Sequence, residues 1–382
     1  MGPEHEQHQV VRAARRARRP LRRDQGLPVR REIAVVAFAQ TRHSGADEGL
    51  AEIEMLAPVI TEIKERTGLA RFGFTCSGSC DYLAGAPFSF VSALDAIGAW
   101  PPISESHVEM DAAWALYEAW VKLLHGDIDT ALVYGFGKSS QGNLRSILTQ
   151  QLDPYHLAPL GIDSVSLAAL QARAYMERSG VKEDDLRAVA ARSRASGRGN
   201  PFALHLPEPG ADEEYDVAPL RPYDVAPITD GAAAIVLAAG DRARELCERP
   251  AWITGIDHRG EPHAPGVRDL TRSEATRLAG ERAGEKAGAA GVEVAELHAQ
   301  FSHEELILRE ALGLGDDVRV NPSGGALSAN PMMAAGLIRI GEAAARIHDG
   351  SASRTLGHAS SGPCLQQNLV CVLSEETGAS HG

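Results

Sequence analysis

Short apolar runs alternate with helical patterns along this chain, and the alternation restarts near residue 251. Ile33–Ala39 predicts a buried strand, and residues 50–67 carry their apolar side chains at the spacing of one helix face. Trp252–Ile256 predicts the first strand of the second series. Alternating strands and helices are typical of α/β proteins, in which helices cover the faces of a sheet. The sequence therefore predicts an α/β fold with two similar halves, residues 32–250 and 251–382.

Residues 141–217 interrupt the first series. They predict helices at 163–180 and 183–194, followed by a passage from Asn200 to Asp216 that is rich in Pro, Gly and Glu. Such a composition is typical of loops that cross a surface. We interpret 141–217 as a loop domain inserted into the N-terminal half.

The charge of the chain is unevenly distributed. Residues 1–31 hold nine arginines against three acids, which gives this segment a charge of +6. Because the net charge of the whole chain is −13, the remaining residues carry a net charge of −19. A body this acidic is a poor general binder of nucleic acid, and we expect a disordered basic tail without the apolar stretch of a secretory signal. Five cysteines without a repeated framework, and no run of 18 apolar residues, predict a cytoplasmic protein that does not enter membranes.

Three motifs carry a resemblance to a known family. Residues 296–302 read ELHAQFS and resemble the His-Asp-Cys-Phe-Ser region of sterol-carrier-protein thiolases. Residues 321–326 read NPSGGA and resemble the glycine-rich segment that precedes the Gly-His-Pro loop of that family, while 229–234 read TDGAAA and match its Asp-Gly-Ala-Ala strand. The matches follow the order of the family over roughly residues 32–376.

The chain thus resembles the thiolase superfamily, and within it the actinobacterial lipid-transfer proteins related to steroid side-chain aldolases. The resemblance implies a thiolase fold, in which two βαβ halves form α-β-α-β-α layers, and a homodimer. It also implies a role in lipid metabolism. Partners of the OB-fold and zinc-ribbon type, or a second thiolase-like subunit, are implied as alternatives to the homodimer.

The chain departs from the family where the family performs its covalent chemistry. A thiolase needs a cysteine at the start of a buried helix, and the resemblance places that position at about Glu109, whose carboxylate cannot form the same thioester. Asn330 stands in place of the histidine of the Gly-His-Pro loop. Cys364 lies near the position of the second catalytic cysteine but is displaced from it.

The remaining groups suit the stabilisation of a developing enolate. His298, the amide of Asn330 and backbone N–H groups of the glycine loops can bind the oxygen of a thioester. Retro-aldol cleavage needs this stabilisation and a base, but no acyl-enzyme. We therefore expect an aldolase that cleaves a β-hydroxyacyl-CoA with a steroid or isoprenoid side chain, with CoA as part of the substrate and no separate cofactor. Acyl transfer by Cys364 and a non-catalytic subunit remain alternatives.

Each catalytic candidate also has a structural explanation. His298 is a candidate for proton transfer or oxygen binding, and Asn330 for an oxyanion donor that also suits a helix N-cap before Pro331. Glu109 and Asp111 are candidate bases, although carboxylates at a helix start are favoured by the helix dipole alone. Two further candidates are His358, ahead of a small-residue loop, and Asp81, in a turn that approaches the active site near the dimer interface in thiolases.

The resemblance also implies contacts to coenzyme A. Arg192 and Arg194 are candidates for its phosphates, with a solvated helix face as the alternative. Ser323, Gly324 and Gly325 are candidates for backbone contacts to the pantetheine arm. Cys76 and Cys80 are spaced C-x₃-C, but no matching Cys/His pair follows at zinc-site spacing, so no metal site is expected.

Overall fold

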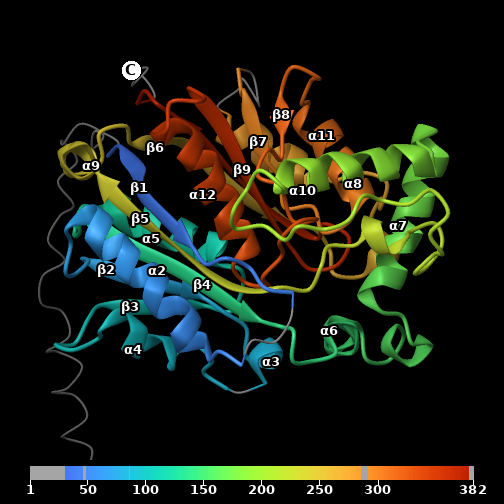
Figure 1. Ribbon diagram of the computed structural model, residues 1–382, viewed down its shortest axis with the longest axis horizontal. Helices are drawn as coiled ribbons and strands as arrows, with labels where there is room; N and C mark the ends of the chain where they lie inside the picture. Colours follow the sequence, from blue (N-terminus) through green and yellow to red (C-terminus); the bar gives the residue numbers. More distant parts are fainter. Residues whose placement is uncertain (1–30, 46–48, 86, 285–290, 378–382) are drawn as a thin grey trace, which may run out of the picture. The chain divides into compact units, whose positions relative to one another are not determined.

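One ten-stranded sheet organises the chain. The computed structural model describes residues 31–45, 49–85, 87–284 and 291–377 (Figure 1). The chain divides into two units, residues 1–30 and 31–382, and everything below concerns the second. Apart from Arg31, the expected basic tail lies outside the described residues.

The strand order of the sheet repeats about its centre. The order is β3-β2-β4-β5-β1-β6-β10-β9-β7-β8, so β3-β2-β4-β5-β1 is mirrored by β8-β7-β9-β10-β6. In both series the three outer strands run parallel and the remaining pairings are antiparallel. The series meet where β1 pairs with β6, with Ala34 beside Trp252. The repeat confirms the predicted α/β fold with two similar halves. The strands are β1 Ile33–Gln40, β2 Phe74–Gly78, β3 Glu105–Val108, β4 Thr130–Lys138, β5 Asp230–Ala239, β6 Ala251–Gly260, β7 Val294–Glu296, β8 Arg319–Val320, β9 Arg354–Ser361 and β10 Gln367–Ser374.

Two buried helices form the middle layer of the fold. Helices α5 (Ala112–His125) and α12 (Ala335–His348) contact each other. Helix α5 packs on strands of the first half, and α12 contacts strands of both halves. Residues 335–344 of α12 are all buried, as expected for a helix enclosed on every side. Helices α2 (Glu52–Thr67) and α4 (Ala93–Ile97) share a hydrophobic core with β1, β4 and β5, and they lie together on one side of these strands (Figure 1).

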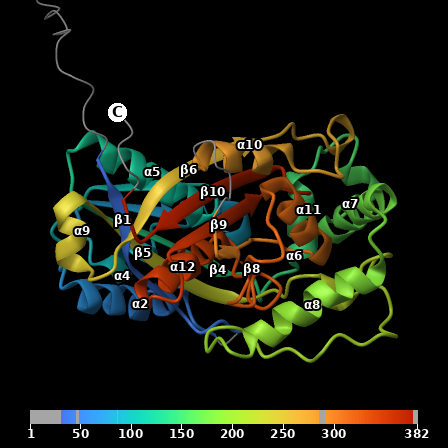
Figure 2. The same cartoon turned by 90° about the horizontal axis from the view of Figure 1, so that it is seen from above.

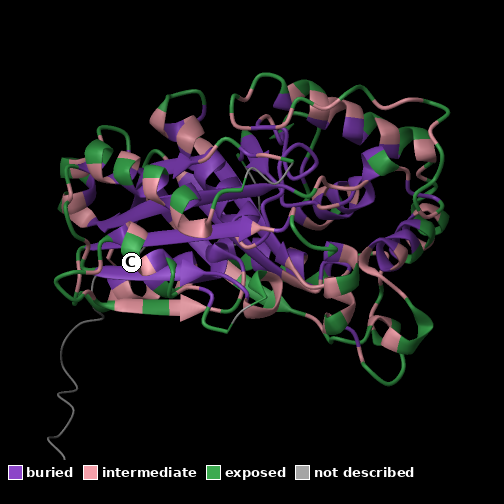
Figure 3. Cartoon of the chain, turned by 60° about the horizontal axis from the view of Figure 1, so that its bottom comes forward, coloured by how far each residue is buried: buried purple, intermediate pink, exposed green. Residues whose placement is uncertain are grey.

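The opposite outer layer covers the second half. Helices α10 (Glu274–Ala283) and α11 (Ser302–Leu312) share a core with β7, β9 and β10. The five layers are therefore α2/α4, the first strands, α5/α12, the second strands and α10/α11. The central strands are buried while the outer helices carry exposed residues (Figure 3). The short helices α3 (Asp81–Ala84) and α9 (Gly240–Leu246) complete the first half.

The inserted region contributes three helices, α6 (Leu144–Leu148), α7 (Ser164–Ser179) and α8 (Glu183–Gly197). Helices α7 and α8 follow the predicted spans closely, and both contact α11 of the second half. They lie at the opposite end of the unit from α9 (Figure 1, Figure 2). The insertion therefore belongs to the first half by its position in the sequence, but it packs against the second half.

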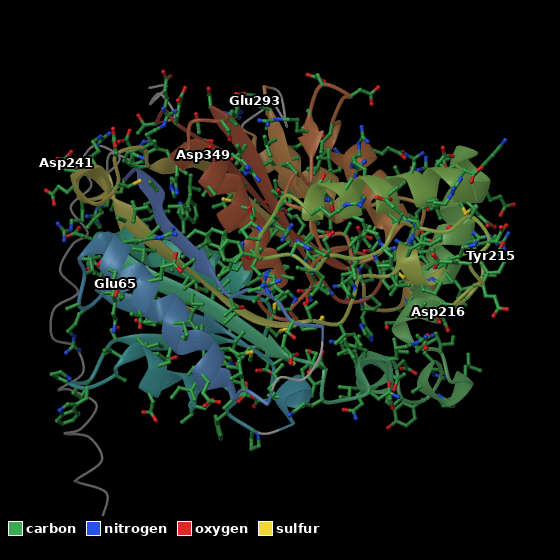
Figure 4. The ribbon with its side chains drawn as sticks, viewed as in Figure 1. Glu65, Tyr215, Asp216, Asp241, Glu293 and Asp349 are labelled. Atoms are coloured by element: carbon green, nitrogen blue, oxygen red, sulfur yellow. The ribbon has the colours of Figure 1, made fainter. Side chains whose placement is uncertain are left out.

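Acidic side chains are concentrated at the periphery. Glu65, Asp241, Glu293 and Asp349 are exposed and point outward from different elements (Figure 4). Tyr215 and Asp216 lie beside α7 in the inserted region, also exposed. Much of the negative charge therefore lies at the surface, whereas seven carboxylates of the described residues are buried: those of Asp111, Asp224, Asp230, Glu296, Glu304, Glu305 and Glu342.

Two element boundaries differ from the sequence prediction where tertiary contacts decide them. A helix starting at Pro331 was expected, but α12 starts at Ala335, because residues 331–334 form a turn in which Met333 has a φ of 67°. His358 was expected just before a loop, but it lies within β9, opposite Val370 of β10. Its pairing partner is too far along the sequence for the local pattern to indicate it.

Candidate active site

A cleft opens where the two central helices begin. It encloses about 800 Å³ of empty space, part of it open to solvent. The N-cap of α5, the turn before α12, the end of β9 with its following loop, the start of α11 and the inserted helices α6 and α7 all contribute to it. The lining residues are Asp111, Leu148, Gln151, Leu152, Ser164, Leu167, His298, Gln300, Phe301, Glu304, Met332, Met333, Ser360, Ser361, Gly362, Pro363 and Cys364.

Asp111 joins the N-termini of the two central helices. Its Oδ1 accepts hydrogen bonds from the N–H groups of Ala113 at 2.8 Å and Leu337 at 3.1 Å, and its Oδ2 accepts one from Gly336 at 2.8 Å. Burial raises the pKa of Asp111, and the three N–H groups act in the opposite direction. This carboxylate is therefore a cap for α5 and α12, and its oxygens are already engaged as acceptors.

A side chain at position 336 would prevent this cap. A Cβ built on Gly336 would lie 2.5 Å from the Cβ of Ala359 and 2.7 Å from Oδ1 of Asp111. Only glycine lets the first turn of α12 approach both β9 and the carboxylate so closely.

Glu109 lies outside the cleft lining. The buried helix α5 begins after its N-cap Asp111, so Glu109 lies two residues before this cap. The Oε1 of Glu109 accepts a hydrogen bond from the backbone N–H of Asp81 at 2.6 Å, and its Oε2 lies 3.2 Å from Nε2 of His107. The carboxylate of Asp81 in turn accepts hydrogen bonds from the backbone N–H groups of Phe88 and Ser89. Glu109 and Asp81 therefore organise one surface turn, and a catalytic role for either stays a prediction.

His298 and Asn330 are brought together as a hydrogen-bonded pair. The backbone N–H of Ser360 donates to Nδ1 of His298 at 3.3 Å, and Nε2 of His298 lies 3.2 Å from Oδ1 of Asn330. A backbone N–H can only donate, so Nδ1 is the acceptor and the neutral ring carries its hydrogen on Nε2. That hydrogen is donated to Oδ1, which leaves both N–H bonds of the Asn330 amide for other acceptors.

Burial keeps His298 neutral. It lowers the pKa of His298 to about 4, with a smaller contribution from the charge of Arg339 in the same direction. A histidine with this pKa carries almost no positive charge at pH 7. His298 therefore acts as a fixed donor that orients Asn330, and this arrangement does not favour proton transfer by an imidazolium.

Asn330 lies at the junction of two clefts. It lines a second cleft of about 810 Å³ that shares Gln300 and Phe301 with the first. Its Nδ2 lies 4.0 Å from Sδ of Met332, a residue of the first cleft. Asn330 is not a helix cap, because α12 starts at Ala335, and its own N–H donates to Oγ1 of Thr229 at 2.9 Å.

His358 is enclosed behind the cleft. Its Nε2 lies 3.0 Å from Oδ1 of Asn368, and its Nδ1 has no hydrogen-bond partner among the described residues. Burial lowers the pKa of His358 to about 3. Since His358 does not line the cleft, its expected role as a second acid or base stays a prediction without a contact that supports it.

Cys364 lines the cleft but is poorly suited to nucleophilic attack. Its Sγ lies 3.6 Å from the carbonyl oxygen of Leu167, and burial raises the pKa of the thiol to about 12. The nucleophile of acyl transfer is the thiolate, and a thiol with this pKa is almost entirely protonated at neutral pH.

The residues expected to bind coenzyme A are engaged within the protein. The Oγ of Ser323 donates to Oε2 of Glu296 at 2.6 Å and accepts from Nη1 of Arg339 at 2.7 Å, in a buried ion-pair network. Gly324 and Gly325 follow with φ values of 98° and 61°. None of the three lines the cleft.

The two arginines of α8 also have partners within the protein. Arg192 forms an ion pair with the buried Glu305, and Arg194 donates to the carbonyl oxygen of Pro207. Neither arginine lines the cleft, so their contact with CoA phosphates stays a prediction.

Glu304 is a cleft residue that the sequence analysis missed. Its Oε2 accepts hydrogen bonds from the backbone N–H groups of Gln300 at 2.9 Å and Phe301 at 3.3 Å, at the start of α11. Burial raises the pKa of Glu304 to about 7. Phe301 occupies the N-cap position, so the sequence shows no Ser/Thr-x-x-Glu pattern that would indicate Glu304, and its burial in a cleft is not visible there either.

Among the described residues, no group of three or more His, Cys, Asp or Glu side chains is arranged to hold a metal ion. No helix in that part of the chain is long and apolar enough to cross a membrane.

Solved structures identify the architecture. A human mitochondrial 3-ketoacyl-CoA thiolase superposes with a TM-score of 0.71 over 90% of this chain and 99% of that chain, at 12% sequence identity. An Ltp2-ChsH2(DUF35) aldolase superposes with a TM-score of 0.74 over 90% of this chain and 98% of that chain, at 19% identity. The chain has a thiolase fold. The expected architecture is confirmed.

Curated proteins with a similar sequence match a smaller share of this thiolase-fold chain than the solved structures do. An acetyl-CoA acetyltransferase of Methanothermobacter thermautotrophicus is 29% identical over 210 residues, which are 48% of this chain and 55% of that protein. A 17-hydroxy-3-oxo-4-pregnene-20-carboxyl-CoA lyase of Mycobacterium tuberculosis is 38% identical over 90 residues, 22% of this chain and 23% of the lyase. The chain spans about half the length of the first curated relatives it matches, and no family model matches it.

Proposed function

We propose that this chain is an enzyme that cleaves a carbon–carbon bond of a β-hydroxyacyl-CoA by retro-aldol chemistry. The thiolase fold and relatives named for acyl-CoA substrates support a thioester substrate. The lyase among the sequence relatives and the aldolase among the structural neighbours support the reaction class. Because that lyase is named for a pregnene carboxyl-CoA, we propose a steroid or related isoprenoid acyl chain.

The amide of Asn330 is the observation that carries this proposal. Its Oδ1 is held by His298, its Nδ2 lies 4.0 Å from Sδ of Met332, and Asn330 lines the second cleft, so we propose that its amide N–H meets the thioester oxygen there. A neutral donor fixed before the reaction begins stabilises a developing oxyanion without reorganisation. The cleft thus offers an enolate site while its one cysteine is held as a thiol.

The proposed reaction needs no redox partner. A base takes the proton of the β-hydroxyl, the bond between Cα and Cβ breaks, and Cβ becomes the carbonyl carbon of one product. The electron pair of the broken bond forms an enolate of the thioester, whose oxygen accepts a hydrogen bond from Nδ2 of Asn330. Protonation of Cα then yields the shortened acyl-CoA.

Acyl transfer is the second enzymatic candidate, and the environment of Cys364 argues against it. Burial and the nearby carboxylate of Glu304 both raise the pKa of this thiol, and the charge of Arg268 lowers it only partly. Acyl transfer through Cys364 predicts an acyl adduct on that residue in intact-mass spectra and loss of turnover in Cys364→Ala. Turnover by Cys364→Ala would exclude Cys364 as the nucleophile.

A partner protein belongs to the proposal. The structural neighbour is named an Ltp2-ChsH2(DUF35) aldolase, which supports assays of this chain both alone and together with a partner protein. We propose a partner of the OB-fold and zinc-ribbon type, as the sequence resemblance implies. A homodimer is the alternative assembly. If turnover requires the partner but is unchanged by Asn330→Ala, the chain is a non-catalytic subunit.

The test is a cleavage assay on a panel of β-hydroxyacyl-CoA esters with steroid and isoprenoid side chains. Mass spectrometry should detect a carbonyl product and a shortened acyl-CoA in equal amounts. Asn330→Ala should lower kcat by about 100- to 1,000-fold, the usual effect of removing one oxyanion donor. Intact substrates after incubation with the complete complex would overturn the retro-aldol proposal.

A further inference from the structure

We infer that Glu304 is the catalytic base of the cleft, which takes the proton of the β-hydroxyl and returns it to Cα of the thioester. This inference rests on the proposed retro-aldol function, which requires a base but does not by itself identify one. Glu304 lies on α11, within the same cleft as His298 and Met332.

The two oxygens of Glu304 have different surroundings. Its Oε2 is fixed by the backbone N–H groups of Gln300 and Phe301. Its Oε1 has no hydrogen-bond partner among the described residues, although the side chain lines the cleft. The carboxylate is therefore held in place by one oxygen, and the other is available to a ligand in the cleft.

No cation neutralises this carboxylate. Glu304 takes part in no ion pair within the part of the chain that the structure describes, in contrast to the neighbouring Glu305, which pairs with Arg192. The guanidinium of Arg268, which comes from the segment before α10, donates instead to the carbonyl oxygens of Pro363 and Cys364. A carboxylate without a counter-ion is a stronger proton acceptor than a paired one.

The other titratable groups around Glu304 do not compete for this role. His303 on the same helix is bound to Gln171, and His298 uses Nδ1 to accept from a backbone N–H. Asp111 is engaged by three backbone N–H groups. Cys364, from the loop between β9 and β10, is a thiol whose pKa is raised to about 12. The pKa of Glu304, raised to about 7 by burial, is the value that suits a proton acceptor at neutral pH.

The proton balance closes within the cleft. Glu304 enters as a carboxylate, accepts the hydroxyl proton as the Cα–Cβ bond breaks, and becomes a carboxylic acid. After the carbonyl product leaves, the acid donates the same proton to Cα of the enolate. The residue returns to its initial state without an oxidant, a reductant or a net proton from solvent.

The test compares Glu304→Gln with wild type and with Glu310→Gln, an exposed carboxylate of the same helix that pairs with Arg178 and Arg272. A glutamine can still accept the two backbone hydrogen bonds, so thermal unfolding should show that Glu304→Gln is folded. We expect kcat to fall by about 100-fold or more with KM little changed, and Glu310→Gln to retain activity. The wild-type profile of kcat/KM should rise with pH through about 7, and Glu304→Gln should lack that limb. Glu304→Asp, which keeps the carboxylate, should recover part of the rate.

A partial reaction separates this inference from the proposed function. Propionyl-CoA in D₂O should gain deuterium at Cα with the wild-type complex, because removal of that proton is the reverse of the final step. Loss of this exchange in Glu304→Gln supports the inference. If Glu304→Gln cleaves the substrate or exchanges the Cα proton at a rate within threefold of wild type, the inference is overturned while the proposed function stands. Wild type that neither cleaves nor exchanges overturns both the proposed function and the inference.

Discussion

Replacement of Asp111 tests whether one carboxylate joins the two central helices. Asp111→Asn is close to isosteric, so it changes the hydrogen bonds while keeping the shape of the side chain. The amide oxygen can still accept from Ala113 and Leu337, but the amide nitrogen would face the N–H of Gly336, which donates to Oδ2 in the wild type. One acceptor is lost and two donors are brought together in a buried site.

The magnitude follows from these three hydrogen bonds. A buried donor left without a partner costs about 1–3 kcal/mol. Burial raises the pKa of Asp111, so loss of its charge adds no further cost, and Asp111→Asn should lower the free energy of unfolding by about 1–3 kcal/mol. Asp111→Ala leaves all three donors unpaired, so its effect should exceed that of Asp111→Asn.

Denaturant unfolding followed by circular dichroism measures this loss. Asp241→Asn, an exposed carboxylate near the start of α9, is the matched control and should change stability by less than about 0.5 kcal/mol. A loss below about 1 kcal/mol for Asp111→Asn, with an unchanged denaturant slope, would refute the reasoning that Asp111 caps both helices.

Two further substitutions test the energetics around the cleft. Burial raises the pKa of Glu304 from an ordinary 4.5 to about 7. Between pH 4.5 and about pH 7, the folded protein therefore holds a proton on Glu304 that the unfolded chain releases. Wild type should lose stability as the pH rises through this range. Glu304→Gln removes this dependence and should be more stable than wild type at pH 8 by up to about 3 kcal/mol, measured as the change in unfolding free energy between pH 5 and pH 8. Gly137→Ala would place a Cβ 2.1 Å from the carbonyl oxygen of Met332, so it should lower the melting temperature by several degrees. Gly266→Ala is the control: its Cβ would have no atom within 4 Å, so the melting temperature should not change. Equal melting temperatures for the two glycine variants would contradict the close approach of β4 to the turn before α12.

The fold was predictable from the sequence because its signal is local and repeated. Each strand is a short apolar run and each helix has its own periodicity, so the restart at residue 251 predicted two halves without any long-range information. The boundaries that failed depend on distant partners. The start of α12 is set by Asp111, which lies more than 200 residues earlier, and His358 belongs to a strand only because it pairs with β10.

The candidate site was predictable in part for the same reason. His298 and Asn330 were found through motifs, and the structure brings them within hydrogen-bond distance. Glu304 was missed because its special character comes from enclosure by the inserted helices and the loop after β9, which no pattern around residue 304 reports. Arg192 looked like a phosphate ligand because its partner Glu305 is distant in the sequence.

Asp111 lies where the two central helices begin, two residues after the position at which the resemblance places the nucleophile of thiolases. Two helix N-termini converge on position 111, and such ends would favour a thiolate there through their dipoles. A carboxylate at this position occupies their N–H groups itself, so they cannot activate a nucleophile or bind an oxyanion. The proposed function therefore takes its donor for the thioester oxygen from the amide of Asn330, and the inferred base is Glu304, which takes part in no ion pair among the described residues.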